Sequence, residues 1–504
     1  EFFSISPSVE PFDEAKYKAL MDGLECSEIA LSDTYHLNAD WFRLDSHFYE
    51  KKYIMLKQKL ETGPHWYLKD LVEKPIQTGH TPSMKNASFY GGTIALIKTD
   101  NLRENFISDV FSDYLSEQGN AEIARTALQE DDIITTIIGA TEDVIARSAL
   151  ITKRFLPANI NQNIVQIRIN QHVVSPAFVN AYFNSYYGRN YMQYLSRQTE
   201  QVNLNCKEIE QVLVPQCSKA LSDMIEACTT LAHNKQQRAQ KSFCEVQKTL
   251  QHELNLNLDQ EVGSISVLEL SRSFRLSGRL DAEYYQPKYD VLFDTLRKLR
   301  CKSLGGENGI VSIKKSIEPG SEAYQNDGIP FVRVSDISKY EIEKPEIYLS
   351  HNVVKDVESL YPKKDTILFS KDGSVGIAYK LERDEDIITS GALLHLTVKN
   401  TSEVLPDYLT LVLNSPVVQM QAERDSNGAI IQHWKLSEIE NVMIPVLDMD
   451  KQEELAEMIQ ESFMLRRQSK LLLEYAKRSV EIAIEQGEDI ALVWLRQRVS
   501  EVGA

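Results

Sequence analysis

The stretch that decides the fold occurs twice, as RLDSHFYEKKYIMLKQKL at residues 43–60 and as RLDAEYYQPKYDVLFDTL at residues 279–296. Both copies continue Arg-Leu-Asp with tyrosines and leucines at the same spacing, at an offset of 236 residues. The offset shrinks to 230 by the Asn-Ser pairs at 184–185 and 414–415, as small loop deletions after a duplication would leave it. A period this long indicates two whole domains rather than the short units of a solenoid.

The composition fits an ordinary globular protein. The 504 residues suffice for two domains plus connectors, and 42% of them are hydrophobic. We expect no transmembrane helix, since no run of about 20 apolar residues occurs, and no signal peptide. The six cysteines form no CxxC pair, which favours a reducing compartment and disfavours a zinc site. The expected location is the cytoplasm.

The net charge of −18 disfavours nucleic acid as a partner, because phosphate binding uses lysine and arginine. The acid is unevenly distributed, however. Residues 1–40 hold nine acidic side chains against two lysines, a net charge of −7. Global charge therefore leaves room for a local basic face elsewhere.

Each copy shows the same expected order of elements. An amphipathic helix comes first, at 41–60 and 279–300, and Pro287 is expected near the start of the second. Short β-type runs follow, at 93–98, 132–138 and 164–169 in the first copy and at 329–334, 366–370, 376–381 and 392–398 in the second. A helix at 176–195 or 406–423 and a strand ending in Pro215 or Pro445 close each copy. We predict mixed α+β domains.

A long polar helix follows each copy, at 218–254 and at 450–486. The first places Ile225, Ala232, Ala239 and Val246 seven residues apart, a narrow stripe typical of helices that pack on one another. The alternative is that each helix packs on its own domain. The repeated placement favours a shared helical spacer.

Several motifs point to one family. Residues 329–337 read IPFVRVSDI, residues 365–376 read DTILFSKDGSVG, and Gly428, Ile444-Pro445-Val446 and Gln452-Glu453 lead into the second long helix. In this order they resemble the DNA-specificity subunits of Type I restriction-modification systems. The first copy departs more: TGHTPS at 78–83 is similar to the family's GGTPS turn, but GAT at 139–141 lacks the Gly-Ser-Val-Gly hairpin.

The resemblance implies a pseudo-twofold α+β architecture, in which two long antiparallel helices form a coiled-coil spacer between two target-recognition domains. Its expected parts are an acidic segment (1–40), domain 1 (41–216), helix 1 (217–256), domain 2 (262–446), helix 2 (447–487) and a tail (488–504). Roughly 34 helical residues span about 50 Å at about 1.5 Å per residue. At roughly 3.4 Å per base pair this is about 15 base pairs, so the expected target is double-stranded DNA with two half-sites and a gap.

The resemblance also implies partners. These are two adenine methyltransferase subunits, which carry S-adenosylmethionine, and a restriction and translocation subunit that uses ATP and Mg. This chain itself is expected to hold no cofactor and no metal. It contains no Gly-x4-Gly-Lys-Ser/Thr loop, no Asn/Asp-Pro-Pro-Tyr run and no HExxH motif, so we expect a non-catalytic subunit.

Candidate DNA contacts lie at strand ends and in loops. Lys98 and Arg333 occupy matching positions, each followed by a small polar residue, Thr99 or Ser335. Arginine suits guanine edges and lysine suits phosphate; the alternative for both is a surface charge at a strand end. The other candidates lie in polar loops and are Lys371 and Ser374, Asn427, Gln432 and Lys435, and Lys85 and Asn86. A plain turn or a solvated loop is the alternative for these.

Two other functions stay open on the sequence. One is the specificity component of another phage-defence methylation system. The other is a duplicated protein-interaction scaffold without DNA binding, which the net charge of −18 favours.

Overall fold

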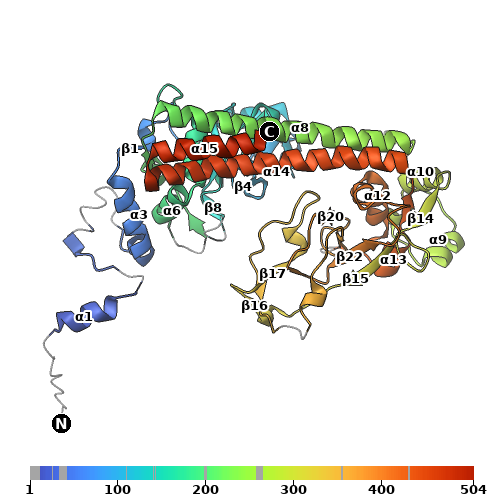
Figure 1. Cartoon of the computed structure of the whole chain (residues 1–504). Coiled ribbons are helices and arrows are strands. Elements are labelled where there is room, and N and C mark those ends of the chain that lie inside the picture. Colours follow the sequence, from blue (N-terminus) through green and yellow to red (C-terminus); the bar gives the residue numbers. More distant parts are fainter. Residues whose placement is uncertain are drawn as a thin grey trace, which may run out of the picture. The chain divides into compact units, whose positions relative to one another are not determined.

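A computed structural model describes residues 12–24, 27–32, 34, 43–108, 110–139, 141, 144–197, 201–256, 265–352, 356–428 and 432–503. The chain divides into two units: unit 1 comprises Glu1–Lys235 and Gln468–Ala504, and unit 2 comprises Gln236–Arg467. Two long helices, α8 (Lys219–Glu253) and α14 (Met449–Gln486), contribute to both units (Figure 1). None of the helices in these ranges is long and apolar enough to cross a membrane.

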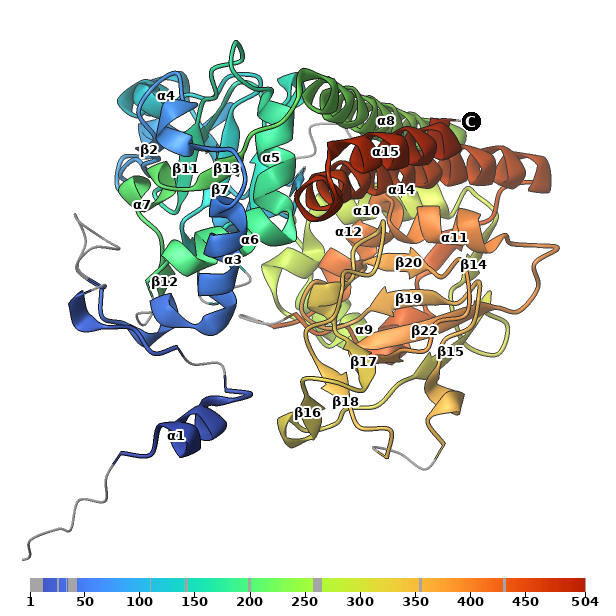
Figure 2. The ribbon, with the colours of Figure 1, turned by 60° about the vertical axis from the view of Figure 1, so that its left-hand side comes forward.

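Unit 2 is built on two four-stranded sheets. The first is antiparallel, in the order β15 (Val311–Lys315), β22 (Leu393–Val398), β19 (Ile367–Ser370) and β20 (Ala378–Lys380). The second has the order β16 (Tyr324–Gln325), β18 (Tyr348–Leu349), β17 (Ile329–Val332) and β21 (Ile388–Thr389), with β17 and β21 parallel. In addition, β14 (Cys301–Ser303) pairs antiparallel with β23 (Met443–Pro445). The helices are α10 (Pro287–Leu296), α11 (Pro406–Leu413), which lies beside β20 (Figure 2), α12 (Pro416–Asp425) and α13 (Leu436–Glu440).

Unit 1 repeats this plan. Its four-stranded sheet has the order β2 (Gln77–Thr78), β11 (Ile164–Ile167), β7 (Ile133–Thr136) and β9 (Ser148–Leu150), again antiparallel. β3 (Tyr90–Ile97) pairs parallel with β10 (Ala158–Ile160) and antiparallel with β6 (Tyr114–Leu115), as β17 does with β21 and β18. β1 (His65–Tyr67) pairs with β13 (Leu213–Pro215) as β14 does with β23. The matching strand orders and directions confirm the predicted duplication and the α+β class.

Two predicted helices are each broken in two at the repeated Asn-Ser pair. The expected helix 176–195 is α5 (Pro176–Asn184) followed by α6 (Tyr186–Leu195), and 406–423 is α11 followed by α12. Ser185 has extended backbone and its side chain accepts a bond from the N–H of Gly188, so it caps α6. Ser415 precedes a proline, which disfavours helical backbone at the serine.

The first amphipathic helix starts later than predicted in unit 1 but at the predicted proline in unit 2. In unit 1, a 3-10 turn (Ser46–Tyr49) precedes α3 (Lys51–Glu61), because the Asp45 carboxylate caps the backbone N–H of Phe48 at 3.2 Å. Residues 41 and 42 lie outside the described ranges. In unit 2, α10 begins at Pro287, as predicted.

The two long helices pack on one another within each unit, as predicted. In unit 1 the Cys228 thiol lies 3.3 Å from the carbonyl of Leu472. In unit 2 the Ser462 hydroxyl donates to the carbonyl of Ala239 at 2.7 Å. Early residues of one helix meet late residues of the other, so the pairing is antiparallel. The predicted stripe, Ile225, Ala232, Ala239 and Val246, is buried.

The two terminal segments differ in packing. The described part of the acidic segment contains α1 (Glu14–Met21), in which no residue is buried; the rest of residues 1–40 lies largely outside the described ranges. The C-terminal segment is helical, as α15 (Glu488–Gly503). Its Ala491, Leu495 and Val502 are buried in the core of unit 1. Unit 1 therefore depends on the end of the chain.

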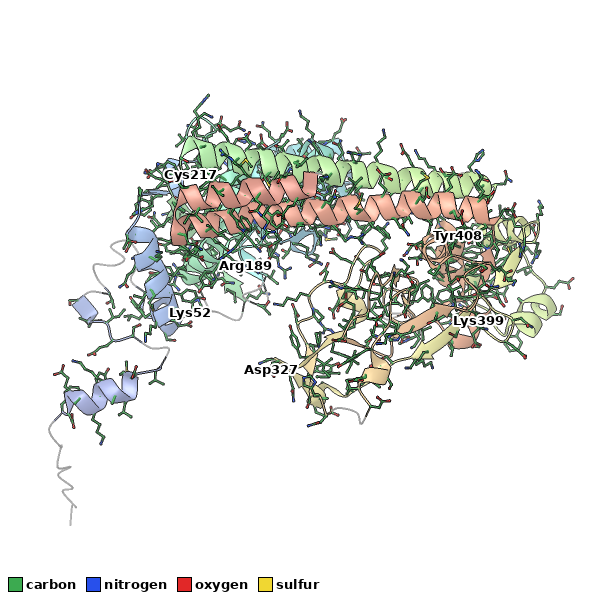
Figure 3. The ribbon with its side chains drawn as sticks, in the orientation of Figure 1. Lys52, Arg189, Cys217, Asp327, Lys399 and Tyr408 are labelled. Atoms are coloured by element: carbon green, nitrogen blue, oxygen red, sulfur yellow. The ribbon has the colours of Figure 1, made fainter. Side chains whose placement is uncertain are left out.

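The core of unit 2 contains polar groups that are paired within it. Tyr408, labelled in Figure 3, is buried; its hydroxyl donates to the carbonyl of Pro445 at 2.8 Å, and burial raises its pKa. His395 on β22 is buried, with its Nε2 2.8 Å from the Thr389 hydroxyl. Burial, together with the charge of Lys314, lowers the pKa of His395 to about 4.

Acid should therefore destabilise unit 2 before its carboxylates titrate. In the unfolded chain, His395 binds a proton below its ordinary pKa of about 6.5. In the folded chain it stays neutral until about pH 4. The contribution of His395 to the free energy of unfolding is fully present above pH 6.5. It falls as pH decreases towards 4, by on the order of 1 kcal/mol per pH unit. We expect His395→Gln to flatten this dependence. The measurement is the urea midpoint of β19 and β22 peptides at each pH, read by a brief deuterium pulse and mass spectrometry. The exposed His80→Gln is the control, and an unchanged slope in His395→Gln contradicts the prediction.

Candidate nucleic-acid interface

The two strand-end cations occupy equivalent positions. Lys98 follows β3 and Arg333 follows β17, and each precedes a 3-10 turn. The backbone N–H of Lys98 donates to Asn101 Oδ1 at 2.9 Å. The N–H of Arg333 donates to Asp336 Oδ2 at 2.8 Å. An equivalent side-chain cap therefore fixes both strand ends, at the matching positions that the alignment of the two copies predicts for Lys98 and Arg333.

The side chains of the two cations differ in electrostatics. Lys98 Nζ forms an ion pair with Asp113, and the hydrogen bond from Lys98 lowers the pKa of that carboxyl. Arg333 Nε lies 3.4 Å from Asp336 Oδ2, and its side chain is 36% exposed. A guanidinium has five N–H donors, so one long contact leaves most of them for another partner. Arg333 is the better placed of the two for an anion or a base edge.

The small polar residues after these cations are not matched. Thr99 Oγ1 is buried without a hydrogen-bond partner among the described residues, and its positional equivalent in unit 2 is Val334. Ser335 is exposed one position further on, and its hydroxyl donates to Asp336 Oδ1 at 2.8 Å. The shared feature is thus the capped turn and not the small side chain.

Most unit 2 candidates meet in one place, which we call the hairpin–loop cluster: residues 371–374 together with residues 427–428 and 432–435. The N–H of Gly373 donates to the carbonyl of Gln432 at 2.8 Å, and the N–H of Trp434 donates to the carbonyl of Lys371 at 2.8 Å. Gly373 has φ +74°, a conformation that favours glycine. Ser374, Asn427, Gln432 and Lys435 are exposed.

A short backbone path joins Arg333 to this cluster. The N–H of Ser390 donates to the carbonyl of Val332 at 2.9 Å, and the N–H of Lys371 donates to the carbonyl of Ala392 at 2.9 Å. The strand end and the hairpin therefore hold the same segment, residues 390–392, from both sides. This fixes the separation between Arg333 and the cluster.

Unit 1 contains the same path with other side chains. The N–H of Asn161 donates to the carbonyl of Ile97 at 3.1 Å. Ile137 N–H donates to Asn163 at 2.9 Å, and Leu204 N–H to Ile137 at 2.9 Å. Ile137 thus takes the place of Lys371. Residue 140, in the segment that lacks the Gly-Ser-Val-Gly hairpin, lies outside the described ranges.

The structure does not bring Lys85 and Asn86 together with Lys98. They precede β3, whereas Lys98 follows it, and eight strand residues span on the order of 20 Å. Asn86 Oδ1 accepts bonds from the N–H and hydroxyl of Ser88, so it caps a local turn. The sequence placed Lys85 and Asn86 in a polar loop of their own, and the turn that Asn86 caps precedes β3.

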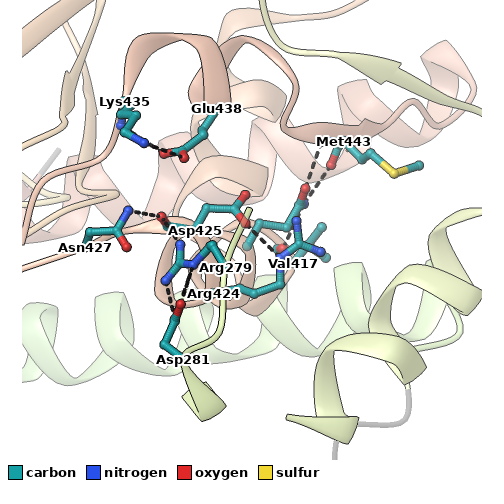
Figure 4. A network of polar contacts seen from close by, with 10 residues as sticks. Arg279, Asp281, Val417, Arg424, Asp425, Asn427, Lys435, Glu438 and Met443 are labelled. Atoms are coloured by element: carbon teal, nitrogen blue, oxygen red, sulfur yellow. Dashed lines mark hydrogen bonds and ion pairs between the residues drawn. The ribbon is translucent and has the colours of Figure 1, made fainter. Parts of the chain in front are cut away.

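The repeated arginine of Arg-Leu-Asp anchors the candidate loops. Arg279 forms an ion pair with Asp281, whose pKa its hydrogen bonds lower, and donates to the carbonyl of Asp425 at 2.9 Å, at the end of α12 (Figure 4). Asn427 Nδ2 donates to that same carbonyl at 3.2 Å. In unit 1, Arg43 donates to the carbonyls of Leu195 and Ser196, at the end of α6.

The sequence missed two residues of the cluster, Asp372 and His433. His433 Nδ1 lies 2.8 Å from Asp372 Oδ1, and Asp372 also forms an ion pair with Lys371. Each lies next to a named candidate, but their pairing spans 61 residues and no local pattern signals it. Within the described ranges, no group of three or more His, Cys, Asp or Glu side chains is placed to hold a metal ion.

Parts of this chain are similar in sequence to known proteins. Residues 307–468 match the family model described as the Type I restriction modification DNA specificity domain. A 153-residue stretch is 23% identical to the Type I restriction enzyme EcoBI specificity subunit of Escherichia coli. In sequence, part of this chain is thus similar to Type I restriction-modification specificity subunits. The alignment covers 29% of this chain and 31% of the length of the EcoBI subunit.

Solved structures of Type I specificity subunits are also similar to this chain. The S subunit from M. genitalium is 12% identical with a TM-score of 0.34, covering 86% of this chain and 95% of that one. The HsdS subunit from Thermoanaerobacter tengcongensis is 15% identical with a TM-score of 0.27, covering 84% and 97%.

The capped turn after Arg333 should contribute to the stability of the chain. Asp336→Ala removes the acceptor of the Arg333 N–H and the Ser335 hydroxyl, so the free energy of unfolding should fall by about 1–2 kcal/mol. Asp336→Asn keeps an oxygen there, as Asn101 does in unit 1, and should lose less. Urea unfolding of the full chain measures both. Equal losses in the two variants would mean that the charge, and not the cap, is responsible.

Proposed function

We propose that this chain is the DNA-recognition subunit of a Type I restriction-modification system and selects a split sequence in double-stranded DNA. The observation that carries the proposal is the repeated scaffold. Each unit places a cation, Lys98 or Arg333, at a capped strand end that is hydrogen-bonded towards a loop. The scaffold bonds are equivalent, whereas the side chains on them differ. Two domains with the same backbone scaffold but different contacting side chains suit the recognition of two different half-sites.

The proposed contacts in unit 2 are Arg333 and the exposed members of the hairpin–loop cluster. Arginine donates to guanine O6 and N7, and amide side chains such as Asn427 and Gln432 suit adenine. Lys371, Ser374 and Lys435 suit phosphate, although Lys371 and Lys435 already lie near Asp372 and Glu438. In unit 1 the main proposed contact is Lys98. Thr99 beside it, and Lys85 and Asn86 in a separate turn, are further proposed contacts that are less well placed to reach DNA.

The long helices would set the gap between half-sites. The 35 residues of α8 correspond to about 52 Å of helix at about 1.5 Å per residue. This is about 15 base pairs at roughly 3.4 Å each. The antiparallel pairing within each unit supports a stiff spacer, because two packed helices bend less easily than one.

We assign the chemistry to partners. Two copies of an adenine methyltransferase subunit would dock on the duplicated chain, since a repeated surface presents two equivalent sites. They would carry S-adenosylmethionine, and a restriction subunit would use ATP and Mg for translocation and cleavage, all in the cytoplasm. This chain would supply position and no catalytic step.

A scaffold that has lost DNA binding is the second candidate, and the net charge of −18 favours it. The acidic segment 1–40 contributes −7 of that charge and precedes the duplicated scaffold. The Lys98–Asp113 and Lys371–Asp372 pairs show that local basic charge is also partly balanced. DNA affinity should therefore depend on the partner subunits.

Methylome sequencing of a host with and without this gene tests the proposed function. With the methyltransferase subunit expressed in both strains, deletion should abolish N6-methyladenine at one split motif and leave other motifs unchanged. The reason is that recognition, and not chemistry, resides in this chain. An identical set of methylated motifs in the two strains contradicts the proposal and favours the scaffold.

Arg333→Ala should relax one half-site and leave the other intact. Loss of a bidentate guanine contact costs about 1–3 kcal/mol, which is roughly 5- to 150-fold in preference at one base. Arg383→Ala, in the same unit with an 81% exposed side chain, is the matched control. Methylation frequencies at all single-base variants of the motif provide the measurement. If both half-sites are read normally, Arg333 is not a base contact.

A further inference from the structure

The loops that follow α6 and α12 close with the same small backbone bridge. In unit 2 the N–H of Asn427 donates to the carbonyl of His433 at 3.0 Å, and the N–H of His433 donates back at 2.7 Å. In unit 1 Arg197 and Asn203 exchange the same two bonds, at 2.8 and 3.1 Å. The offset between the units is 230 residues for both partners. His433 and Asn203 therefore occupy one and the same position of the duplicated scaffold.

A second pairing confirms this equivalence. His433 forms a β-bridge with Asp372 in the hairpin. Asn203, on β12 (Val202–Asn203), pairs with Ile138 on β8 (Ile138–Gly139). Each position is thus held from two sides by backbone bonds. The backbone is shared by both units, and only the side chains differ.

The His433 ring is oriented and accessible. Its Nδ1 lies 2.8 Å from Asp372 Oδ1, and the side chain is 63% exposed. A carboxylate only accepts hydrogen bonds, so Nδ1 carries the proton. Nε2 has no hydrogen-bond partner among the described residues. When the ring is neutral, Nε2 accepts a hydrogen bond; when the ring is charged, Nε2 donates one.

Asn203 offers a different group at the same place. It is partly buried, and within the described part of the chain its amide has no hydrogen-bond partner. An amide presents a donor and an acceptor side by side, the pattern that matches N6 and N7 of adenine. A ring nitrogen presents a single point, which suits an exocyclic amine or guanine N7.

We propose that His433 and Asn203 are the paired specificity-determining positions, each contacting a base edge in its own half-site. Asp372 is a positioning residue, which acts by fixing the His433 ring, and Lys371 balances its charge. The proposal rests on the proposed function, because it needs the two units to read DNA. Beyond the proposed function, it names the side chains, His433 and Asn203, that give the two units different base preferences.

Exchange of the two side chains tests the proposal. The full chain, in complex with its methyltransferase subunit, selects from a double-stranded DNA library randomised across both half-sites. His433→Asn should change base preference at least tenfold at one position of one half-site. Asn203→His should do so in the other half-site only. His351→Asn, an exposed histidine of unit 2 outside the cluster, is the matched control and should select the wild-type motif.

Asp372→Asn separates orientation from folding. It should broaden preference at the base affected by His433→Asn while leaving the thermal melting temperature unchanged. His433→Gln replaces His433→Asn if that variant melts early. A structural role alone would change melting and leave the selected motif intact.

The outcomes distinguish the inference from the proposed function. A clear wild-type motif that all variants share overturns the inference and leaves the function standing. Uniform weakening on every sequence, with the motif retained, indicates phosphate contact and also overturns the inference. Failure of the wild-type complex to select any motif overturns the proposed function itself.

Discussion

The duplicated fold depends on one interaction, the bond from the arginine of Arg-Leu-Asp to the last carbonyls of a helix. Arg43 binds the end of α6 and Arg279 binds the end of α12. The final carbonyls of a helix have no partner within the helix and carry its partial negative charge, so a guanidinium stabilises them well. The loop that begins at this point leads to Asn203 or His433. The motif therefore holds the loop at its origin, about 150 residues away in sequence.

The local patterns of the sequence were sufficient for much of the fold. Short β-type runs bounded by turn residues predicted β7, β11, β17, β19 and β22, and heptad spacing predicted the buried stripe of α8. The equivalence of Lys98 and Arg333 also followed from the repeat. Whether a segment forms a helix or a strand depends mainly on residues that are close in sequence, so these elements and their repeat were predictable.

Long-range contacts were not predictable in this way. The pairing of Lys98 with Asp113 and of Asp372 with His433 depends on strand register, which no local pattern specifies. The break at Ser185 follows from a side-chain cap that competes with a continuous helix. The strand predicted at 93–98 is β3 (Tyr90–Ile97), which begins three residues earlier than predicted.

The packing of α15 has a consequence for how the chain is made. Unit 2 is a single uninterrupted segment, Gln236–Arg467, whereas the core of unit 1 needs Ala491, Leu495 and Val502 from the far end. Domains generally fold as units while the ribosome is still adding residues. Although most of unit 1 is synthesised first, its core cannot close until α15 has emerged, so unit 2 can finish folding before it.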